Sequence, residues 1–400
     1  MTASRTARTT RTSRSTRTVR PPARPTPRGP APELVLVAAV AILCGFGLVM
    51  LYSASQVLSI TKFHNPWYFV GRQTVWLAIG VALALVAARI PMRVWRDRLS
   101  WVLMGATLLS LGWVAAGEIS RRLTGSLLPF VIQENDATRW MGTSSVRFQP
   151  SELAKLALIL WLARDLSDRG RDLGTWRGLR APLGAAGVIA LLVMVGDDLG
   201  TTLLLGLVVL AMLWMAGAPR RTIGALFGVM AVGAVAAIRF LQGFRANRIT
   251  AFLNPSEHTS GAGYQLLQSQ IGLASGGLFG SGAGYSRAKW GFLPEAHTDF
   301  IAAVIGEEFG LMGTLFLVVL VAVFLGAGFA IAMRTVPLFG RLVAIGITVW
   351  IGVQALINIG VTAGLLPTKG ITLPFISYGG SSMMLSLMGV GVLVAVARDR

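Results

Sequence analysis

The 400-residue sequence is poor in cysteine and in charge. Its single cysteine, Cys44, excludes a disulfide framework and a cysteine-rich metal site. Only 13% of the residues are charged, whereas 54% are hydrophobic, and several apolar runs approach twenty residues. A soluble protein would interrupt such runs with a polar face. The composition therefore excludes that class and predicts an all-α polytopic membrane protein.

Nucleotide-binding and hydrolase motifs are also missing. The sequence contains no P-loop, no GxSxG elbow and no DxD signature of a nucleotide-sugar transferase. An enzyme with this sequence would need a substrate that reaches it already activated, without a nucleotide bound in the cytoplasm.

Acidic residues are absent from the first 32 positions, which contain eight arginines. Ser, Thr and Pro fill most of the rest, so residues 1–32 are predicted to be a disordered cytoplasmic tail. Such a tail would stay near anionic lipid; an arginine-rich arm that binds nucleic acid is the less favoured alternative. Residues 33–400 are predicted to form the membrane domain.

About ten transmembrane helices are predicted in this domain, with both termini in the cytoplasm. They lie near 34–54, 69–89, 99–117, 150–164, 182–197, 201–218, 222–241, 299–331, 340–363 and 381–397. With the tail inside, the inner segments carry 23 of the 36 basic residues, as the positive-inside rule requires. The large extracytoplasmic loop 242–298, between the seventh and eighth helices, is the predicted place of function.

Polar residues where a bilayer should exclude them are the candidates for chemistry. Asp299, at the entry to the eighth helix, is the best single candidate for a general base; a helix-capping acid is its alternative. His297 could act as a base or a ligand, although no His or Cys partner lies at metal-ligand spacing. Glu307 and Glu308 are predicted to be buried partners of basic residues such as Arg72.

A second group of candidates surrounds the fourth helix. Glu152 and Lys155 are spaced i, i+3 and share a helix face, which fits either a local ion pair or a site. Arg139 and Arg147 precede this helix on the outer side. Together with Lys155 they would form a cationic surface suited to a phosphate or diphosphate group.

Six segments of the chain resemble the SEDS family (shape, elongation, division and sporulation), which includes FtsW and RodA. They are RFQPSELAKLAL (147–158), DLGTTLLL (198–205), RITAFLNP (248–255), GYQLLQSQIGLASGGLFGSG (263–282), FLPEAHTDFIAAVIGEEFG (292–310) and NIGVTAGLLPTKGITLPFISYGGSS (358–382). The resemblance spans the membrane domain and is closer to the division member than to the elongation member. Two stretches depart from the family's pattern: Gly196-Asp197 and Thr138-Arg139-Trp140.

The resemblance implies a peptidoglycan glycosyltransferase that polymerises lipid II at the outer face of the bacterial cytoplasmic membrane, at the division septum. Asp299 would be the general base of an inverting transfer, and Arg147 and Lys155, with Arg139 or a divalent cation, would stabilise the departing diphosphate. The implied substrate-binding residues are Arg72, Arg139, Arg147, Glu152, Lys155, His297 and Lys369. No cofactor is otherwise expected, and no protein metal site.

The partners implied by the resemblance are lipid II, a class B penicillin-binding transpeptidase, other divisome proteins and membrane lipids, with no nucleic acid. A lipid II flippase and a divisome scaffold are the alternative functions. A transporter should concentrate its polar groups at the membrane midplane, near broken helices. Here the reactive residues cluster toward one face, which favours the enzyme.

Overall fold

The computed structural model describes residues 30–134, 137–143, 146–168, 173–240, 251–255, 261–368 and 370–399. The chain divides into a short N-terminal unit, Met1–Ala31, and a compact unit, Pro32–Arg400, which contains all the helices and strands. The predicted disordered tail therefore lies almost entirely outside the described residues.

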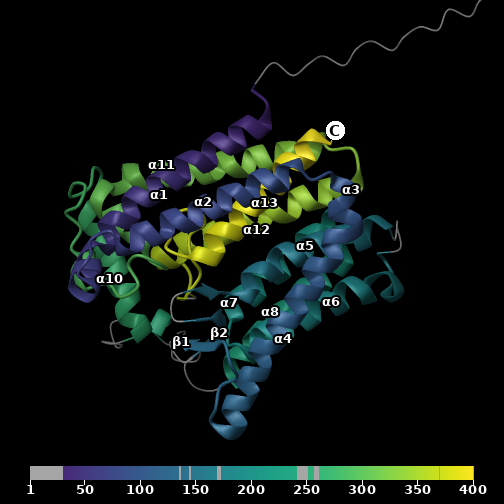
Figure 1. Ribbon diagram of the computed structural model, residues 1–400, viewed down its shortest axis with the longest axis horizontal. Helices are drawn as coiled ribbons and strands as arrows, with labels where there is room; N and C mark the ends of the chain where they lie inside the picture. The colour runs from purple at the N-terminus through teal and green to yellow at the C-terminus, as the bar shows by residue number, and fades with distance from the viewer. Residues whose placement is uncertain are drawn as a thin grey trace, which may run out of the picture. The chain divides into compact units, whose positions relative to one another are not determined.

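Ten long helices of the compact unit coincide with the ten predicted ones (Figure 1). They are α1 (Pro32–Phe63), α2 (Tyr68–Arg89), α4 (Ser100–Thr124), α5 (Pro150–Asp168), α6 (Trp176–Val195), α7 (Leu199–Met215), α8 (Arg220–Phe240), α11 (Ile301–Arg334), α12 (Leu338–Thr362) and α13 (Gly380–Arg398). Shorter helical elements are α3 (Met92–Val94), the π-helical turn η1 (Trp95–Leu99), α10 (Gly261–Gly276) and the 3-10 turn η3 (Ala288–Trp290).

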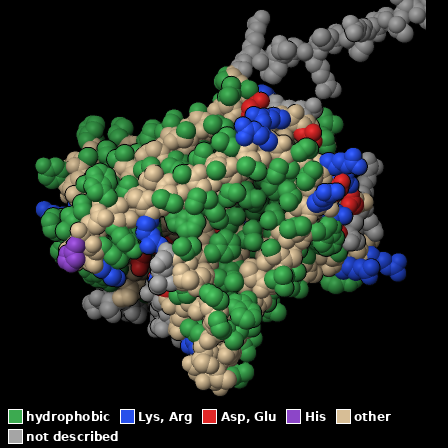
Figure 2. All heavy atoms as spheres, viewed as in Figure 1, with side chains coloured by type: hydrophobic (Ala, Val, Ile, Leu, Met, Phe, Trp, Pro, Cys, Tyr) green, Lys and Arg blue, Asp and Glu red, His purple; other side chains and the backbone are tan. Residues whose placement is uncertain are grey.

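Seven segments among the described residues are long and apolar enough to cross a membrane. They are α1, α2, the continuous stretch from α3 to α4, α6, α11, α12 and α13. Hydrophobic side chains cover the middle of the visible face, whereas charged side chains gather toward its ends (Figure 2). The polytopic α-helical class is thus confirmed. Membrane crossing by α5, α7 and α8 stays a prediction.

Helix α12 is the central element of the membrane unit. It packs against α5, α7, α11 and α13, while α2 packs against α13 and α1 against α11 (Figure 1). Its polar residues Thr348, Gln354, Asn358 and Thr362 are therefore buried among neighbouring helices instead of facing lipid. Buried polar groups need hydrogen-bond partners, so this helix can organise the segments around it.

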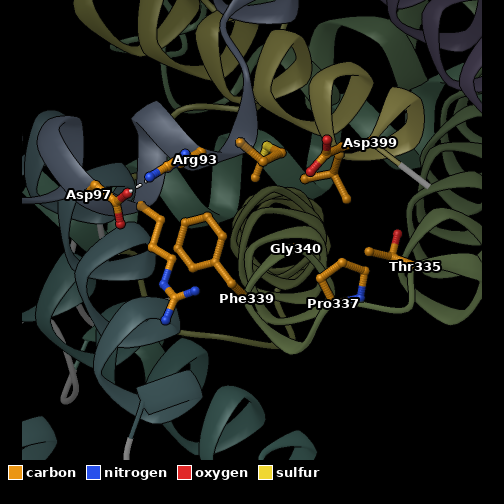
Figure 3. Close-up of a pocket in the computed structure, with 10 residues that line it drawn as sticks. Arg93, Asp97, Thr335, Pro337, Phe339, Gly340 and Asp399 are labelled. Carbon is orange, nitrogen blue, oxygen red and sulfur yellow. Dashed lines mark ion pairs between the residues drawn. The ribbon is translucent and has the colours of Figure 1, made fainter.

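The predicted inner segments meet at one end of the unit. A cavity of about 480 Å³ lies there, between η1, the turn that joins α11 to α12, and the end of α13 (Figure 3). Its lining includes Arg93, Asp97, Phe339 and Asp399, and Arg93 pairs with Asp97 at 3.5 Å. The meeting of these three segments agrees with the sidedness that the arginines predict.

A small sheet lies in the chain between α4 and α5. Strands β1 (Val131–Glu134), β2 (Ala137–Gly142) and β3 (Arg147–Phe148) pair antiparallel in that order. The hydroxyl of Thr138 on β2 donates to the buried carboxylate of Glu118 on α4 at 2.6 Å. This bond holds the sheet against the C-terminal part of α4.

The eighth predicted helix differs from the expected 299–331 in two ways. Helix α11 begins at Ile301, so Asp299 lies in the preceding turn. The helix also breaks at Gly310, whose backbone has φ 64° and ψ −156°, a conformation that only glycine adopts readily. The break divides α11 into a short N-terminal part and a long C-terminal part.

The loop after α10 repairs the backbone of α11 at this break. In an unbroken helix Leu311 and Met312 would donate their N–H groups to the carbonyls of Glu307 and Glu308. Those N–H groups instead donate to the carbonyls of residues 277 and 278, at 2.9 and 3.2 Å. The freed carbonyls accept from the N–H groups of residues 281 and 282, at 2.9 and 3.1 Å. A membrane tolerates a broken helix when its backbone groups are satisfied in this way.

Candidate active site

Asp299 lies in a tight turn that leads into α11. The N–H groups of Thr298, Asp299 and Phe300 all donate to the carbonyl of Glu295, at 3.1 to 3.3 Å. Glu295 itself has a positive φ of 59°, and its carboxylate accepts from the Thr298 hydroxyl at 2.7 Å. Non-glycine residues in this conformation are held there by their surroundings. The turn therefore has a defined shape.

Three consecutive carbonyls of this turn are hydrogen-bonded to other parts of the fold. The His297 carbonyl accepts from the Tyr378 N–H at 3.0 Å, and the Thr298 carbonyl from the Ser377 hydroxyl at 2.5 Å. The Asp299 carbonyl accepts from the side-chain amide of Asn358 at 2.7 Å. We refer to these three bonds as the carbonyl clamp. It fixes the main chain that carries the Asp299 carboxylate.

The segment 370–378 forms the wall next to that carboxylate. Gly370 has a φ of +65°, and a Cβ atom at its position would lie 3.5 Å from Oδ2 of Asp299. Lys369, a predicted substrate-binding residue, lies outside the described residues and directly precedes this glycine in the sequence. This distance is an ordinary van der Waals contact, so the wall backbone lies directly beside the carboxylate, and the positive φ is what favours glycine at position 370.

Arg72 and Arg147 are brought to the same end of the molecule. Both lie close enough to Tyr378 to oppose the rise in the pKa of its hydroxyl that burial causes. Arg72 also donates to the Tyr68 hydroxyl at 3.1 Å. Arg147 pairs with Glu134 at 2.8 Å and is 39% exposed, so its guanidinium remains accessible. Since Tyr378 also bonds to the Asp299 turn, two arginines and the candidate base share one region.

His297 is held inside this region instead of projecting from it. Its ring lies 4.7 Å from that of Phe69 and 5.9 Å from that of Tyr378, measured between centroids. Burial lowers the pKa of His297 below 6.5, and the nearby charge of Glu295 opposes that shift. The imidazole is therefore neutral at neutral pH and serves mainly as part of an aromatic cluster.

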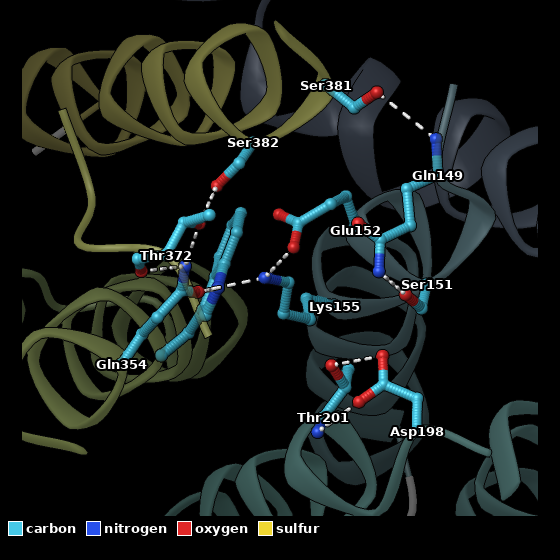
Figure 4. A network of polar contacts seen from close by, with 11 residues as sticks. Gln149, Ser151, Glu152, Lys155, Asp198, Thr201, Gln354, Thr372, Ser381 and Ser382 are labelled. Atoms are coloured by element: carbon cyan, nitrogen blue, oxygen red, sulfur yellow. Dashed lines mark hydrogen bonds and ion pairs between the residues drawn. The ribbon is translucent and has the colours of Figure 1, made fainter. Parts of the chain in front are cut away.

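Glu152 and Lys155 form a buried ion pair at 2.7 Å, the first of the two arrangements that their spacing allows (Figure 4). The Lys155 side chain is only 2% exposed and also donates to Oε1 of Gln354 at 2.8 Å. Gln354 in turn donates to the carbonyl of Thr372 at 3.0 Å. Lys155 thus reaches the wall segment through Gln354, and its burial argues against direct contact with a diphosphate.

Arg139 is engaged elsewhere. Its guanidinium donates to the carbonyls of Gly196 and Asp197, at 3.2 and 2.6 Å, in the turn between α6 and α7. These bonds fasten β2 to that turn. The Arg139 guanidinium is therefore engaged in a structural contact. The sequence suggests instead that it belongs to a cationic surface open to a phosphate group.

Glu307 and Glu308 are buried, as predicted, but with different partners. Glu307 accepts from the hydroxyl of Ser286 at 2.5 Å and from the N–H groups of residues 287 and 288. Glu308 accepts from the Ser53 hydroxyl at 2.5 Å and lies 4.0 Å from Lys289, not against Arg72. Both carboxylates hold the loop before the Asp299 turn and take no part in the candidate site.

A protein-built metal site does not form among the described residues. No group of three or more His, Cys, Asp or Glu side chains there could hold a metal ion. The residues around Asp299 do not by themselves fit the divalent cation that the resemblance suggests. No chemical step below depends on one.

Sequence reasoning missed the residues that hold the site together, namely Gln354, Asn358, Ser377 and Tyr378. The available signal was the pair of amides, Gln354 and Asn358, one turn apart in an otherwise apolar membrane helix. Polar residues in such helices usually mark functional positions. Their partners could not be found without the fold.

The fold and the site define a polytopic membrane protein with a carboxylate and two arginines at one end of its helical unit. The family model described as "Cell cycle protein", for FtsW, RodA and SpoVE, matches residues 34–400. The chain therefore belongs to this family.

Curated relatives cover nearly the whole chain. It is 39% identical, over 91% of its length and 94% of the relative's, to the probable peptidoglycan glycosyltransferase FtsW of Geobacter metallireducens. It is 38% identical, over 93% of its length and 99% of the relative's, to the stage V sporulation protein E of Bacillus subtilis.

Solved structures show the same architecture. A chain of a peptidoglycan synthase complex, studied for how polymerization and crosslinking are coordinated, matches with a TM-score of 0.73 and 28% identity. The match covers 91% of this chain and 97% of that one. The rod shape determining protein RodA of Thermus thermophilus matches with a TM-score of 0.66 and 28% identity, over 91% and 96% of the two chains.

Proposed function

We propose that the protein is a peptidoglycan glycosyltransferase that polymerises lipid II at the outer face of the bacterial cytoplasmic membrane. The observation that carries this proposal is the carboxylate of Asp299, held by the carbonyl clamp at the end of the molecule where Arg72 and Arg147 also lie. A base and two cations in one region suit a transfer that releases an anionic leaving group.

In the proposed reaction, Asp299 accepts the proton of the 4-hydroxyl of the acceptor N-acetylglucosamine. The oxygen attacks the anomeric carbon of the donor N-acetylmuramic acid. The bond from that carbon to the lipid diphosphate breaks, its electron pair leaves with the diphosphate, and the configuration inverts from α to β. Arg72 and Arg147 stabilise the charge on the diphosphate, because guanidinium groups suit phosphate oxygens.

The remaining predicted residues receive supporting roles. Lys155 and Glu152 fix Gln354 and with it the wall segment, and Arg139 anchors the sheet. Lys369 is proposed as a further contact with the diphosphate, since it adjoins Gly370. The family likeness also supports septal activity in partnership with a transpeptidase that crosslinks the strands.

The test is polymerisation of lipid II by the purified protein, with and without its cognate transpeptidase. Asp299→Asn should lower the rate of strand formation by about 10²–10⁴-fold, the usual contribution of a general base. Asp97→Asn, the same change at the inner cavity, should leave the rate unchanged. Normal polymerisation by the Asp299 variant would refute the mechanism. Passage of lipid II across liposome membranes without strand formation would instead identify a flippase.

A further inference from the structure

Asn358 is a buried amide near the C-terminal end of α12. It lies on α12, is 1% exposed, and faces segments distant in the sequence. A buried amide is costly unless its polar atoms are bonded, and its Oδ1 has no hydrogen-bond partner among the described residues. Both hydrogens of its Nδ2 are used, one toward the carbonyl of Asp299 and one toward the carbonyl of Ile371, each at 2.7 Å.

These two bonds join the turn of the base to the wall beside it. Ile371 directly follows Gly370, whose backbone lies next to Oδ2 of Asp299. Asn358 therefore links the main chain at Asp299 to the main chain at Ile371, in addition to the direct bonds that Ser377 and Tyr378 of the wall make to the turn. Asn358 reaches only backbone oxygens, so it acts on the carboxylate without touching it.

The neighbouring contacts limit what the loss of Asn358 would do. The His297 and Thr298 carbonyls keep their bonds to Tyr378 and Ser377. The wall keeps its bond from Gln354 to the carbonyl of Thr372. Without Asn358 the turn would keep these bonds and its internal bonds to the Glu295 carbonyl, but the carbonyl of Asp299 would lose the bond from Asn358. The expected consequence is a misplaced carboxylate in a folded protein.

We propose that Asn358 is a positioning residue for the Asp299 base, acting through the main chain of the turn. The proposal rests on the proposed role of Asp299 in the polymerisation of lipid II. A displacement of a reacting group by about 1 Å can lower a rate about 100-fold. Asn358 donates both hydrogens to main-chain carbonyls and not to the substrate, so its loss should lower kcat more than it raises KM.

The experiment compares Asn358→Leu and Asn358→Asp with Thr348→Val. Thr348 is a matched control, because it is buried on the same helix and bonds only to that helix, at the carbonyl of Ala344. The Asn358 variants should lose about 10- to 100-fold in kcat for lipid II, with KM within about twofold of the original. The control should keep both constants, and all three proteins should elute as folded monodisperse species in detergent.

A double-variant cycle with Asp299→Glu separates positioning from general damage. Asp299→Glu also displaces the carboxylate, so the double variant with Asn358→Leu should lose less than the product of the two single losses. The double variant with Thr348→Val should lose that product. An unchanged kcat in Asn358→Leu, or strictly multiplicative losses, would overturn the positioning role.

The outcomes also separate this inference from the proposed function. If the unaltered protein makes strands, Asp299→Asn does not, and Asn358→Leu is fully active, only the positioning role is refuted. If the Asp299→Asn protein polymerises normally, the proposed mechanism fails and the positioning role fails with it.

Discussion

At the scale of single residues, Lys155 shows how a charge can serve a site that it does not touch. Its ammonium group lies between Glu152 and Gln354, and Gln354 holds the wall next to Asp299. The pair is buried, so each charge depends on the other for its solvation. The network is only partly satisfied, because Oε2 of Glu152 has no hydrogen-bond partner among the described residues.

Removing the cation alone should destabilise the fold. In Lys155→Met the carboxylate of Glu152 stays buried without its partner, which typically costs about 3–5 kcal/mol. Thermal unfolding in detergent should show a lower midpoint for this variant. The double variant Glu152→Gln with Lys155→Met should regain most of the loss, because it leaves no unpaired charge. A single variant as stable as the original protein would show that the pair contributes little.

The buried imidazole of His297 predicts a dependence of stability on pH. Its folded-state pKa is lowered below 6.5, so between those two values the unfolded chain binds a proton that the folded protein does not. The contribution of the neutral imidazole to the free energy of unfolding is therefore complete above pH 6.5. It is lost as the pH falls toward the folded-state pKa, by at most about 1.4 kcal/mol per pH unit. His297→Phe keeps an aromatic ring but cannot take up this proton. The temperature midpoint of unfolding should therefore change less with pH in this variant, between pH 7.5 and 5, than in the original protein.

The exposed His64 provides the matched control for this measurement. Its φ of 52° suits asparagine, so His64→Asn should fold normally and keep the original pH dependence. Equal pH profiles for His297→Phe and the original protein would contradict the assignment of the effect to His297.

At the scale of elements, α11 shows what apolar periodicity can and cannot predict. The apolar run correctly placed a long helix there, because the bilayer requires its backbone to be hydrogen-bonded within the segment. The break at Gly310 was not predicted, since a glycine in such a run is equally compatible with a straight helix. The break depends on the loop 277–282, which supplies the missing partners.

Gly310 should be far less replaceable than a glycine in the regular part of the same helix. A Cβ at Gly310 would lie 2.5 Å from the nitrogen of Gly280 and 2.7 Å from the carbonyl oxygen of Leu278. This combination of φ and ψ, which is essentially restricted to glycine, adds about 1–3 kcal/mol for any other residue. Gly310→Ala should therefore lower the midpoint of thermal unfolding and the yield of folded protein.

Gly326 is the control for this substitution, because no atom lies within 4 Å of its Cβ position. Gly326→Ala should be neutral or stabilising, by up to about 1 kcal/mol, since alanine favours helix. Similar midpoints for the two alanine variants would mean that α11 can straighten without cost.

The small sheet also shows a limit of sequence reasoning. Its strands are short, and the sequence gives no alternation long enough to separate them from a loop. The two stretches that depart from the family's pattern prove to touch, since Arg139 donates to the carbonyls of Gly196 and Asp197. The two unusual stretches therefore form one contact with each other, and only the three-dimensional structure shows it.

At the scale of the whole molecule, the positions of the helices could be predicted from the sequence, but the contacts between distant segments could not. Long apolar runs are visible locally, so ten helix positions were found from composition alone. The site, however, depends on pairs such as Asn358 with Asp299 and Ser377 with Thr298, which are 59 and 79 residues apart. Local periodicity contains no information about such pairs. The resemblance identified Asp299 as important, and the fold supplied the groups that hold it.

The repaired break in α11 has a consequence for how the protein enters the membrane. Residues 277–282 precede α11 in the chain, so ribosomes make the repairing loop before the helix that needs it. When the broken helix leaves the translocon, its backbone partners already exist on the same chain. A circular permutation that placed this loop after α11 would leave four backbone groups of the helix unpaired when it enters lipid, namely two N–H groups and two carbonyls. Each unpaired group is costly in hydrocarbon. The order of the sequence thus contributes to assembly, not only to the final fold.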